Sequence, residues 1–182
     1  MSTDMATELH FDASEFDILG RAIARLPGDI KTKAFARAMS RMRDMARTRI
    51  VRRSSERTDI PVGMVRALTT AYLNAGGHSI EMVMRSGWVP LAKLGARQTS
   101  TGVSVRNRGS YRSAFLANMA SGHRGVMIRE GAARLPIREL FGANPAHDVT
   151  NNPDEFLPVL AEVIQDHLLP RVLHELERLL PG

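Results

Sequence analysis

A long amphipathic stripe in the first third of this 182-residue chain constrains its fold more than any other feature. From Ile30 onwards, apolar residues recur at the spacing of one helix face, and basic residues occupy the other faces. Asp29 can cap the start of this segment. The pattern predicts a helix of about five turns or more with a strongly basic back. The apolar stripe consists of Ala34, Phe35, Ala38, Met39, Met42, Ala46 and Ile50, and the basic residues are Lys33, Arg37, Arg41, Arg43, Arg47 and Arg52.

A second amphipathic pattern closes the chain. Residues 152–155 combine a cap residue, a proline in the first turn and two carboxylates near the positive end of the helix dipole. This combination predicts a long C-terminal helix that Pro170 bends or divides. Its apolar stripe consists of Phe156, Leu160, Val163, Ile164, Leu168, Leu173, Leu176 and Leu180.

Shorter segments surround the first long helix. Residues 14–26 have helical spacing and end at Pro27-Gly28. Residues 52–59 lack apolar side chains, which predicts a loop. Residues 60–73 are expected to begin with Ile-Pro-Val and continue as a helix that residues 74–77 terminate.

The period of the apolar residues then changes from helical to alternating, which indicates strands. One alternation covers residues 80–85, where every second residue is isoleucine or methionine, and another covers residues 103–106, where every second residue is valine. Two more strands are predicted at residues 115–119 and 126–129, joined by the hairpin-turn residues 121–123. We expect a meander of four or five short strands.

Together these patterns predict an α+β fold with N-terminal helices, a central antiparallel β-sheet meander and a long C-terminal amphipathic helix. The length fits one domain, so residues 21–182 are expected to form a single α+β domain behind an acidic N-terminal segment at residues 1–20. Aromatic residues make up only 5% of the chain. The core must therefore rest on aliphatic side chains and on part of the ten methionines.

Charge is segregated along the chain within a net charge of +6. Residues 1–20 carry −5, residues 21–66 carry +9, residues 67–138 carry +8 and residues 139–182 carry −6. Acidic ends around a basic middle suit contact with nucleic acid, or head-to-tail pairing between an acidic face and a neighbour's basic face. Simply solvated charge is the third interpretation.

The chain lacks the residues that several classes of chemistry require. The chain has no cysteine, which excludes disulfides, thiolate catalysis and cysteine-based zinc sites. No apolar run reaches the length of a membrane span, and the acidic start is unlike a secretory signal, so we expect a soluble protein made in the cytoplasm. Gly76-Gly77 and residues 122–125 match neither common phosphate-loop pattern, which disfavours nucleotide binding.

The six histidines do not form a recognisable site. None of them stands at the close spacing of a helical zinc motif, and His167 and His174, seven residues apart, lack a third ligand. His147-Asp148 could pair a base with an orienting carboxylate, but adjacent residues do not point at each other. A hydrolase that uses His147 or His123 is therefore the weakest hypothesis, and we expect no enzyme, no metal and no cofactor.

The arginines of residues 21–138 are suited to sequence-independent contact with phosphates. Trp88, Tyr72, Tyr111 and scattered phenylalanines are the only aromatic residues, so no platform for base stacking is predicted. If DNA is bound, its backbone should be contacted along a channel.

Five motifs in the middle of the chain resemble, in order and spacing, the minor tail protein Z family of long-tailed phages and prophages, the tail-completion proteins. They are Pro90 to Thr99, Gly102 to Val105, Ala114 to Met119, Gly122 to Val126 and Arg134 to Ile137. The resemblance extends from about residue 22 to residue 180. Ser113 departs from it, because a glycine is expected there, and so does the acidic opening.

The resemblance implies a non-enzymatic virion protein in the neck, at the head-proximal end of the tail. It would help join tail to head, and it could position the DNA end. We expect a homo-oligomeric ring with the sixfold symmetry of a tail tube, in contact with tail-terminator, tail-tube and head-tail connector proteins. Assembly would take place in the host cytoplasm, without a membrane.

Within the motifs, the apolar residues are expected to form the buried face of a sheet, and their arginine neighbours to face an interface or lumen. The buried set is Leu94, Val103, Val105, Phe115, Val126 and Ile137. The interface or lumen candidates are Arg37, Arg41, Arg97, Arg106, Arg112, Arg124 and Arg129. The alternative function is a basic module that binds the DNA backbone without sequence specificity.

Overall fold

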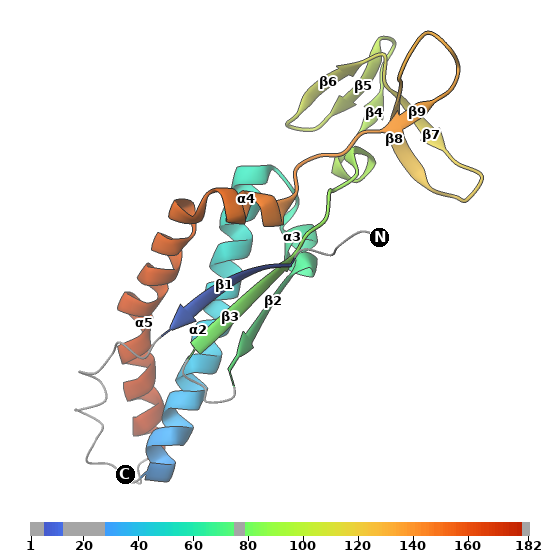
Figure 1. The fold of residues 1–182 in the computed structure, drawn as a ribbon. Helices are drawn as coiled ribbons and strands as arrows, with labels where there is room; N and C mark the ends of the chain where they lie inside the picture. The colour runs from blue at the N-terminus through green and yellow to red at the C-terminus, as the bar shows by residue number, and fades with distance from the viewer. Residues whose placement is uncertain (1–5, 13–27, 75–78, 180–182) are drawn as a thin grey trace.

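The computed structural model describes residues 6–12, 28–74 and 79–179, and its fold is α+β as predicted (Figure 1). A body of helices and one three-stranded sheet carries a projecting lobe of short strands. The predicted helix at residues 14–26 lies outside the described residues.

Helix α2 (Gly28–Thr58) is one uninterrupted helix of 31 residues. The predicted apolar stripe is buried, except that Phe35 is half-buried. The predicted loop at residues 52–59 is wrong, because neither glycine nor proline interrupts the helix there. Ser54 and Thr58 are buried instead, and the Thr58 hydroxyl donates a hydrogen bond of 2.6 Å to the Ser54 carbonyl oxygen.

The body sheet has the antiparallel order β1-β3-β2. Its strands are β1 (Ala6–Asp12), β2 (Thr69–Leu73) and β3 (Ser79–Arg85). The predicted alternation in β3 is confirmed, because Ile80, Met82 and Met84 are buried. The predicted helix at residues 60–73 is correct only for α3 (Val62–Leu68). Thr69, Thr70 and Tyr72 are β-branched or aromatic, and they pair with β3 instead of extending the helix.

The C-terminal helix begins later than predicted and stays whole. Residues 152–155 contribute to a short 3-10 helix, η2 (Pro153–Glu155), and α5 (Leu157–Glu177) follows with Pro170 inside it. Val172 is buried in place of Leu173, and Leu180 lies outside the described residues. Helix α4 (Pro145–Asn151), which the sequence patterns did not indicate, precedes η2.

Helices α2 and α5 run antiparallel beside the sheet (Figure 1). Side chains from α2, β3 and α5 surround one small internal cavity, which places the core of the body between these three elements. Alanines on the buried face of α2 leave room for close packing. The cavity is lined by Met42, Ala46, Ile80, Met82, Leu160, Val163 and Ile164.

The projecting lobe contains two three-stranded antiparallel sheets, so the predicted single meander is wrong. The first sheet is β4 (Arg97–Gln98), β5 (Gly102–Val105) and β6 (Gly109–Arg112). The second is β7 (Phe115–Asn118), β8 (Arg124–Arg129) and β9 (Ile137–Glu139). Ser113, with a φ of 61°, turns the backbone between β6 and β7, and the two strands do not pair.

Two detailed predictions for the lobe have different outcomes. The hairpin at residues 121–123 is confirmed: Gly122 has a φ of 81°, and its amide donates to the Met119 carbonyl oxygen over 2.9 Å. The predicted buried face is divided between the 3-10 helix η1 (Leu91–Leu94) and the two sheets. Of that set, Leu94, Val103, Val105 and Val126 are buried, and Phe115 and Ile137 are half-buried.

Candidate interaction surface

The lobe joins the body through two adjacent chain segments, which we call the stem (residues 86–91 and 140–144). The amides of Val89 and Leu91 donate to the carbonyl oxygens of Ala143 and Leu140, over 3.4 and 3.2 Å. The buried Asn144 side chain fastens the stem to α4, because it accepts hydrogen bonds from the amides of Gly87 and Ala146. The stem thus connects the lobe to the body of the protein.

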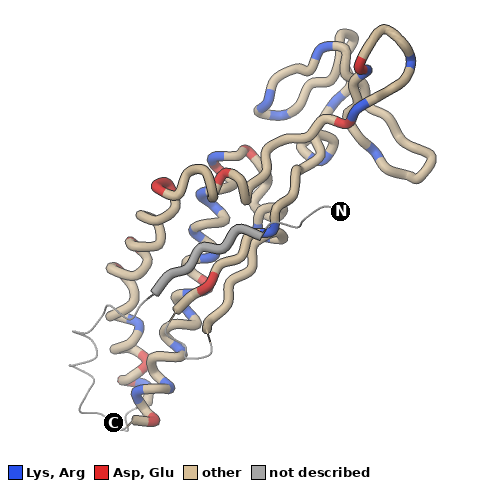
Figure 2. Tube along the Cα trace, viewed as in Figure 1, with Lys and Arg blue, Asp and Glu red and all other residues tan. Residues whose placement is uncertain are grey.

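The lobe (residues 92–139) has a strongly positive charge. It contains nine lysines and arginines against two glutamates, a net charge of +7, and blue positions outnumber red ones there in Figure 2. Both glutamates already have a partner. Glu139 lies 3.0 Å from the Nε2 atom of His123, and Glu130 lies 3.8 Å from Arg138. We call residues 92–139 the basic lobe.

Five of the seven predicted interface candidates lie on the basic lobe. Arg97 is in β4, Arg112 in β6, and Arg124 and Arg129 in β8; Arg106 follows β5, and all five are exposed. Within the described residues, none of the five forms an ion pair with a carboxylate. The Arg129 guanidinium lies over the Phe115 ring, 4.8 Å from the ring centroid, so the ring covers one face of the guanidinium.

Arg106 also lines a shallow pocket of about 410 Å³ where the basic lobe meets the end of α2. Lys93 and Asp59 share that pocket. Arg108 crosses the same junction and donates a hydrogen bond to the Thr58 carbonyl oxygen. The end of α2 is therefore tied directly to the lobe.

The other two candidates, Arg37 and Arg41, lie on α2 and have different surroundings. Arg37 lies 3.8 Å from the buried Glu175 of α5, so it belongs to a series of ion pairs that joins the two antiparallel helices. Arg41 has no ion pair among the described residues, and it lines a groove beside α5. The seven candidates therefore do not form one surface.

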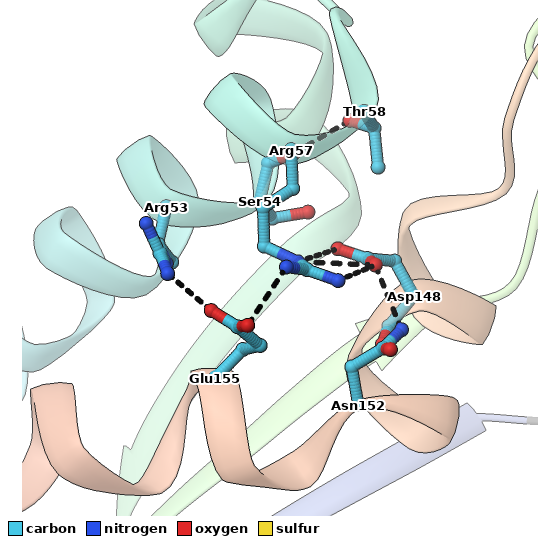
Figure 3. A network of polar contacts seen from close by, with 7 residues as sticks. All are labelled: Arg53, Ser54, Arg57, Thr58, Asp148, Asn152 and Glu155. Atoms are coloured by element: carbon cyan, nitrogen blue, oxygen red, sulfur yellow. Dashed lines mark hydrogen bonds and ion pairs between the residues drawn. The ribbon is translucent and has the colours of Figure 1, made fainter.

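The series of ion pairs, which we call the ion-pair ladder, follows α2 to its end. Arg49 pairs with Glu162 at 2.5 Å, and Arg53 pairs with Glu155. At the last turn, Arg57 lies between Asp148 and Glu155, at 3.1 and 3.3 Å (Figure 3). The acidic C-terminal third thus neutralises one side of the basic helix.

Arg57 has the most strongly coupled charge in the ladder. Its hydrogen bonds to Asp148 raise the pKa of the guanidinium above its ordinary value, and the charges of Asp148 and Glu155 add to this against partial desolvation. Asp148 is held in turn by the Asn152 side chain at 3.0 Å. The guanidinium therefore remains charged at neutral and mildly alkaline pH.

The groove beside α2 contains an excess of positive charge that sequence reasoning did not find. It has a volume of about 370 Å³ and is lined by four arginines, with Asp44 the one acidic residue of its lining. Arg43 binds Asp44 over 2.8 Å. The groove residues are Arg41, Asp44, Met45, Thr48, Arg49, Arg52 and Arg171. Helical spacing could have grouped Arg41 with Arg52, but only the tertiary structure brings Arg171 to them.

The histidines considered as catalytic or ligating residues have other contacts. The His147 ring packs edge-on against Trp88, with centroids 5.4 Å apart, and Asp148 binds Arg57 instead. His167 lies 3.1 Å from Arg49. Among the residues that the structure describes, no group of three histidine, aspartate or glutamate side chains could hold a metal ion.

Trp88 is the only tryptophan of the chain, and 57% of it is exposed where the stem meets α4. It lines an open cleft of about 580 Å³ together with Tyr111, Arg108 and His147.

No helix in the described part of the chain is long and apolar enough to cross a membrane.

Comparison with protein-family models, with curated proteins and with solved structures gives no match for this chain. The class of protein therefore has to be inferred from the residues and surfaces described above.

Proposed function

We propose that this protein is a non-enzymatic structural subunit of a long-tailed phage or prophage-like particle. In this proposal it completes the tail at the head-proximal end, in the neck, and helps join the tail to the head. It acts as a homo-oligomeric ring, six subunits matching a tail tube, in contact with tail-terminator, tail-tube and connector proteins. It needs no metal or cofactor, and it assembles in the host cytoplasm.

One observation supports this proposal above the others. The five motifs that resemble minor tail protein Z lie entirely within the stem and the basic lobe, from Pro90 to Ile137. This part of the chain projects from the body and exposes the five candidate arginines, which have no carboxylate partner among the residues that the structure describes. Exposed, uncompensated charge on a projecting arm favours a role in contacting other molecules.

Deleting the coding sequence from the genome that carries it tests this proposal. We expect filled heads and separate tails in negative-stain electron micrographs, with joining restored when the gene is supplied in trans. A matched frameshift in a gene unrelated to the particle is the control. Joined, infectious particles at the normal yield in the deletion strain would contradict the proposal.

Contact with the DNA backbone is a second candidate function, and the net charge of the basic lobe favours it. Titrating the full chain with duplex DNA over a salt series measures it, because each neutralised phosphate adds about 0.9 to the slope of log affinity against log salt. Tight binding by a monomer, with a steep slope and no sequence preference, would favour this function over assembly. A slope near zero would exclude it.

A further inference from the structure

The outer face of α5 combines two leucines with two acidic residues. Leu169 and Leu173 are 48% and 49% exposed, although most other leucines of this helix are buried. Asp166 and Glu177 flank them at helical spacing, so all four side chains share one face. Among the described residues, neither the Asp166 nor the Glu177 side chain has an ion pair or hydrogen bond. We call these four residues the acidic leucine face.

The groove beside α2 has the opposite chemistry. Arg41, Met45, Thr48 and Arg52 follow each other at helical spacing in its lining, and Arg171 of α5 also lines it. Neither Arg41, Arg52 nor Arg171 has a carboxylate partner among the described residues. This row of α2 therefore presents two arginines without carboxylate partners, with an apolar side chain and a hydroxyl between them. The other two charged residues of the α2 lining, Arg49 and Asp44, already pair with Glu162 and Arg43.

The two surfaces also match in length. Arg41 and Arg52 are eleven residues apart, and so are Asp166 and Glu177, which corresponds to about 16 Å along each helix. Between the charges, the groove offers Met45 and the face offers Leu169 and Leu173. Two antiparallel or parallel helices could thus pair both charges and bury the leucines. A phosphate backbone would offer the leucines no apolar contact, so a protein helix fits better than DNA.

The two surfaces point away from each other on the same molecule. Arg171 lies two residues from both Leu169 and Leu173, a rotation of about 200° around the helix axis. One copy therefore cannot place its own acidic leucine face in its own groove. Contact between different patches on successive copies is heterologous, and such contacts form a ring where the rotation closes.

We propose that the acidic leucine face of α5 in one copy docks into the arginine groove of α2 in the next copy. This inference rests on the proposed ring function and names the surfaces that would build the ring. Arg41 and Arg52 pair with Asp166 and Glu177, and Leu169 and Leu173 cover Met45.

Two charge-reversed variants of the full chain test this pairing. R41E/R52E has an acidic groove and an acidic face, and D166R/E177R has a basic groove and a basic face. We expect each alone to self-associate about a hundredfold more weakly than the unmodified chain, because like charges then meet. Mixed in equal amounts, the two variants are complementary, and they should recover association as alternating copies. Sedimentation velocity measures all three samples.

A control separates this interface from other charged surfaces. R97E/R112E reverses two exposed arginines of the basic lobe and leaves both helix surfaces intact. Circular dichroism of every variant shows whether the fold is kept. L169S/L173S gives a second test without any change of charge, and it should also weaken association.

Three results would overturn the inference. The first is an unmodified chain that stays monomeric at every concentration, and the second is undiminished association of both reversed variants. The third is loss of DNA binding in R41E/R52E with self-association unchanged, which would assign the groove to DNA. A chain that associates only through the basic lobe would reject this interface but not the neck function, whereas joined particles after gene deletion would reject the neck function alone.

Discussion

The turn between β6 and β7 depends on a residue type that is poorly suited to it. Ser113 has a φ of 61°, in the left-handed region, where an L side chain costs about 1–2 kcal/mol. Its amide still donates to the Thr101 carbonyl oxygen over 3.0 Å, so the turn is held in place. The resemblance predicts glycine at this position, and the positive φ supplies a physical reason for that expectation.

Ser113→Gly should therefore stabilise the protein by about 0.5–1 kcal/mol, the left-handed strain relieved minus the entropy that glycine loses on folding. Denaturant unfolding followed by circular dichroism measures the change. Ser110→Gly is the matched control, because Ser110 lies in β6 with no positive φ, and there glycine should destabilise. Equal effects of the two substitutions would refute the explanation.

Gly102 is needed for a different reason, because two backbones come very close there. A Cβ atom on Gly102 would lie 2.1 Å from the Tyr111 carbonyl oxygen of the paired strand β6. Gly102→Ala should force the sheet apart and cost about 1–3 kcal/mol. Thermal unfolding measures it against Gly131→Ala, where a Cβ atom would meet nothing within 4 Å. If both substitutions were neutral, the close approach would not matter for stability.

At the scale of elements, the ion-pair ladder explains why α2 continues where a loop was predicted. The helix continues through residues 52–58 because Arg53 and Arg57 pair with Asp148 and Glu155, which stand about a hundred positions later in the chain. Neighbouring sequence contains no sign of these partners. A local pattern could therefore not show that this polar segment has a buried side.

A double-mutant cycle measures the coupling between Arg57 and Asp148. Arg57→Gln and Asp148→Asn should each lower the free energy of unfolding, and together they should lower it by less than their sum. The coupling should shrink at 1 M salt, where the Debye length is about 3 Å. Strictly additive effects would show that the pair contributes nothing.

The pH dependence of this coupling has a defined sign. Because the folded-state pKa of Arg57 is raised, its contribution is fully present below the ordinary arginine pKa, and it is lost only as the pH rises through the raised value. The coupling should therefore be the same at neutral and mildly alkaline pH. A decrease within that range would require another titrating group.

The sequence predicted well those elements whose regularly spaced apolar residues pack into a single core. The stripes of α2 and α5 and the alternation of β3 met this condition. Residues 69–73 did not, because their pairing with β3 overrides the helical spacing. The division of the lobe into two sheets was equally hidden, since it depends on a left-handed serine. Five of the candidate arginines could be grouped from the sequence, because they lie in or beside the motifs of the resemblance. The arginine groove could not be predicted in this way, because Arg171 joins it only when α5 packs beside α2.

For the whole molecule, the basic lobe and the arginine groove are two separate positive surfaces. Replacing the five candidate arginines of the basic lobe with glutamine should reduce the salt slope of DNA binding by about 4.5 and leave self-association intact. The double substitution Arg41→Gln with Arg52→Gln should instead weaken self-association and leave the salt slope of DNA binding unchanged. Fluorescence anisotropy and sedimentation velocity measure the two properties on the same samples. Parallel losses in both variants would mean that one continuous surface serves both purposes.

The position of Trp88 has a practical consequence. It is the only indole in the chain, it is largely exposed, and it lies against His147 where the stem meets α4. Indole emission shifts with the polarity of the surroundings of the ring. Any partner that covers this junction, or any bending of the lobe, therefore changes the intrinsic fluorescence of the unlabelled protein.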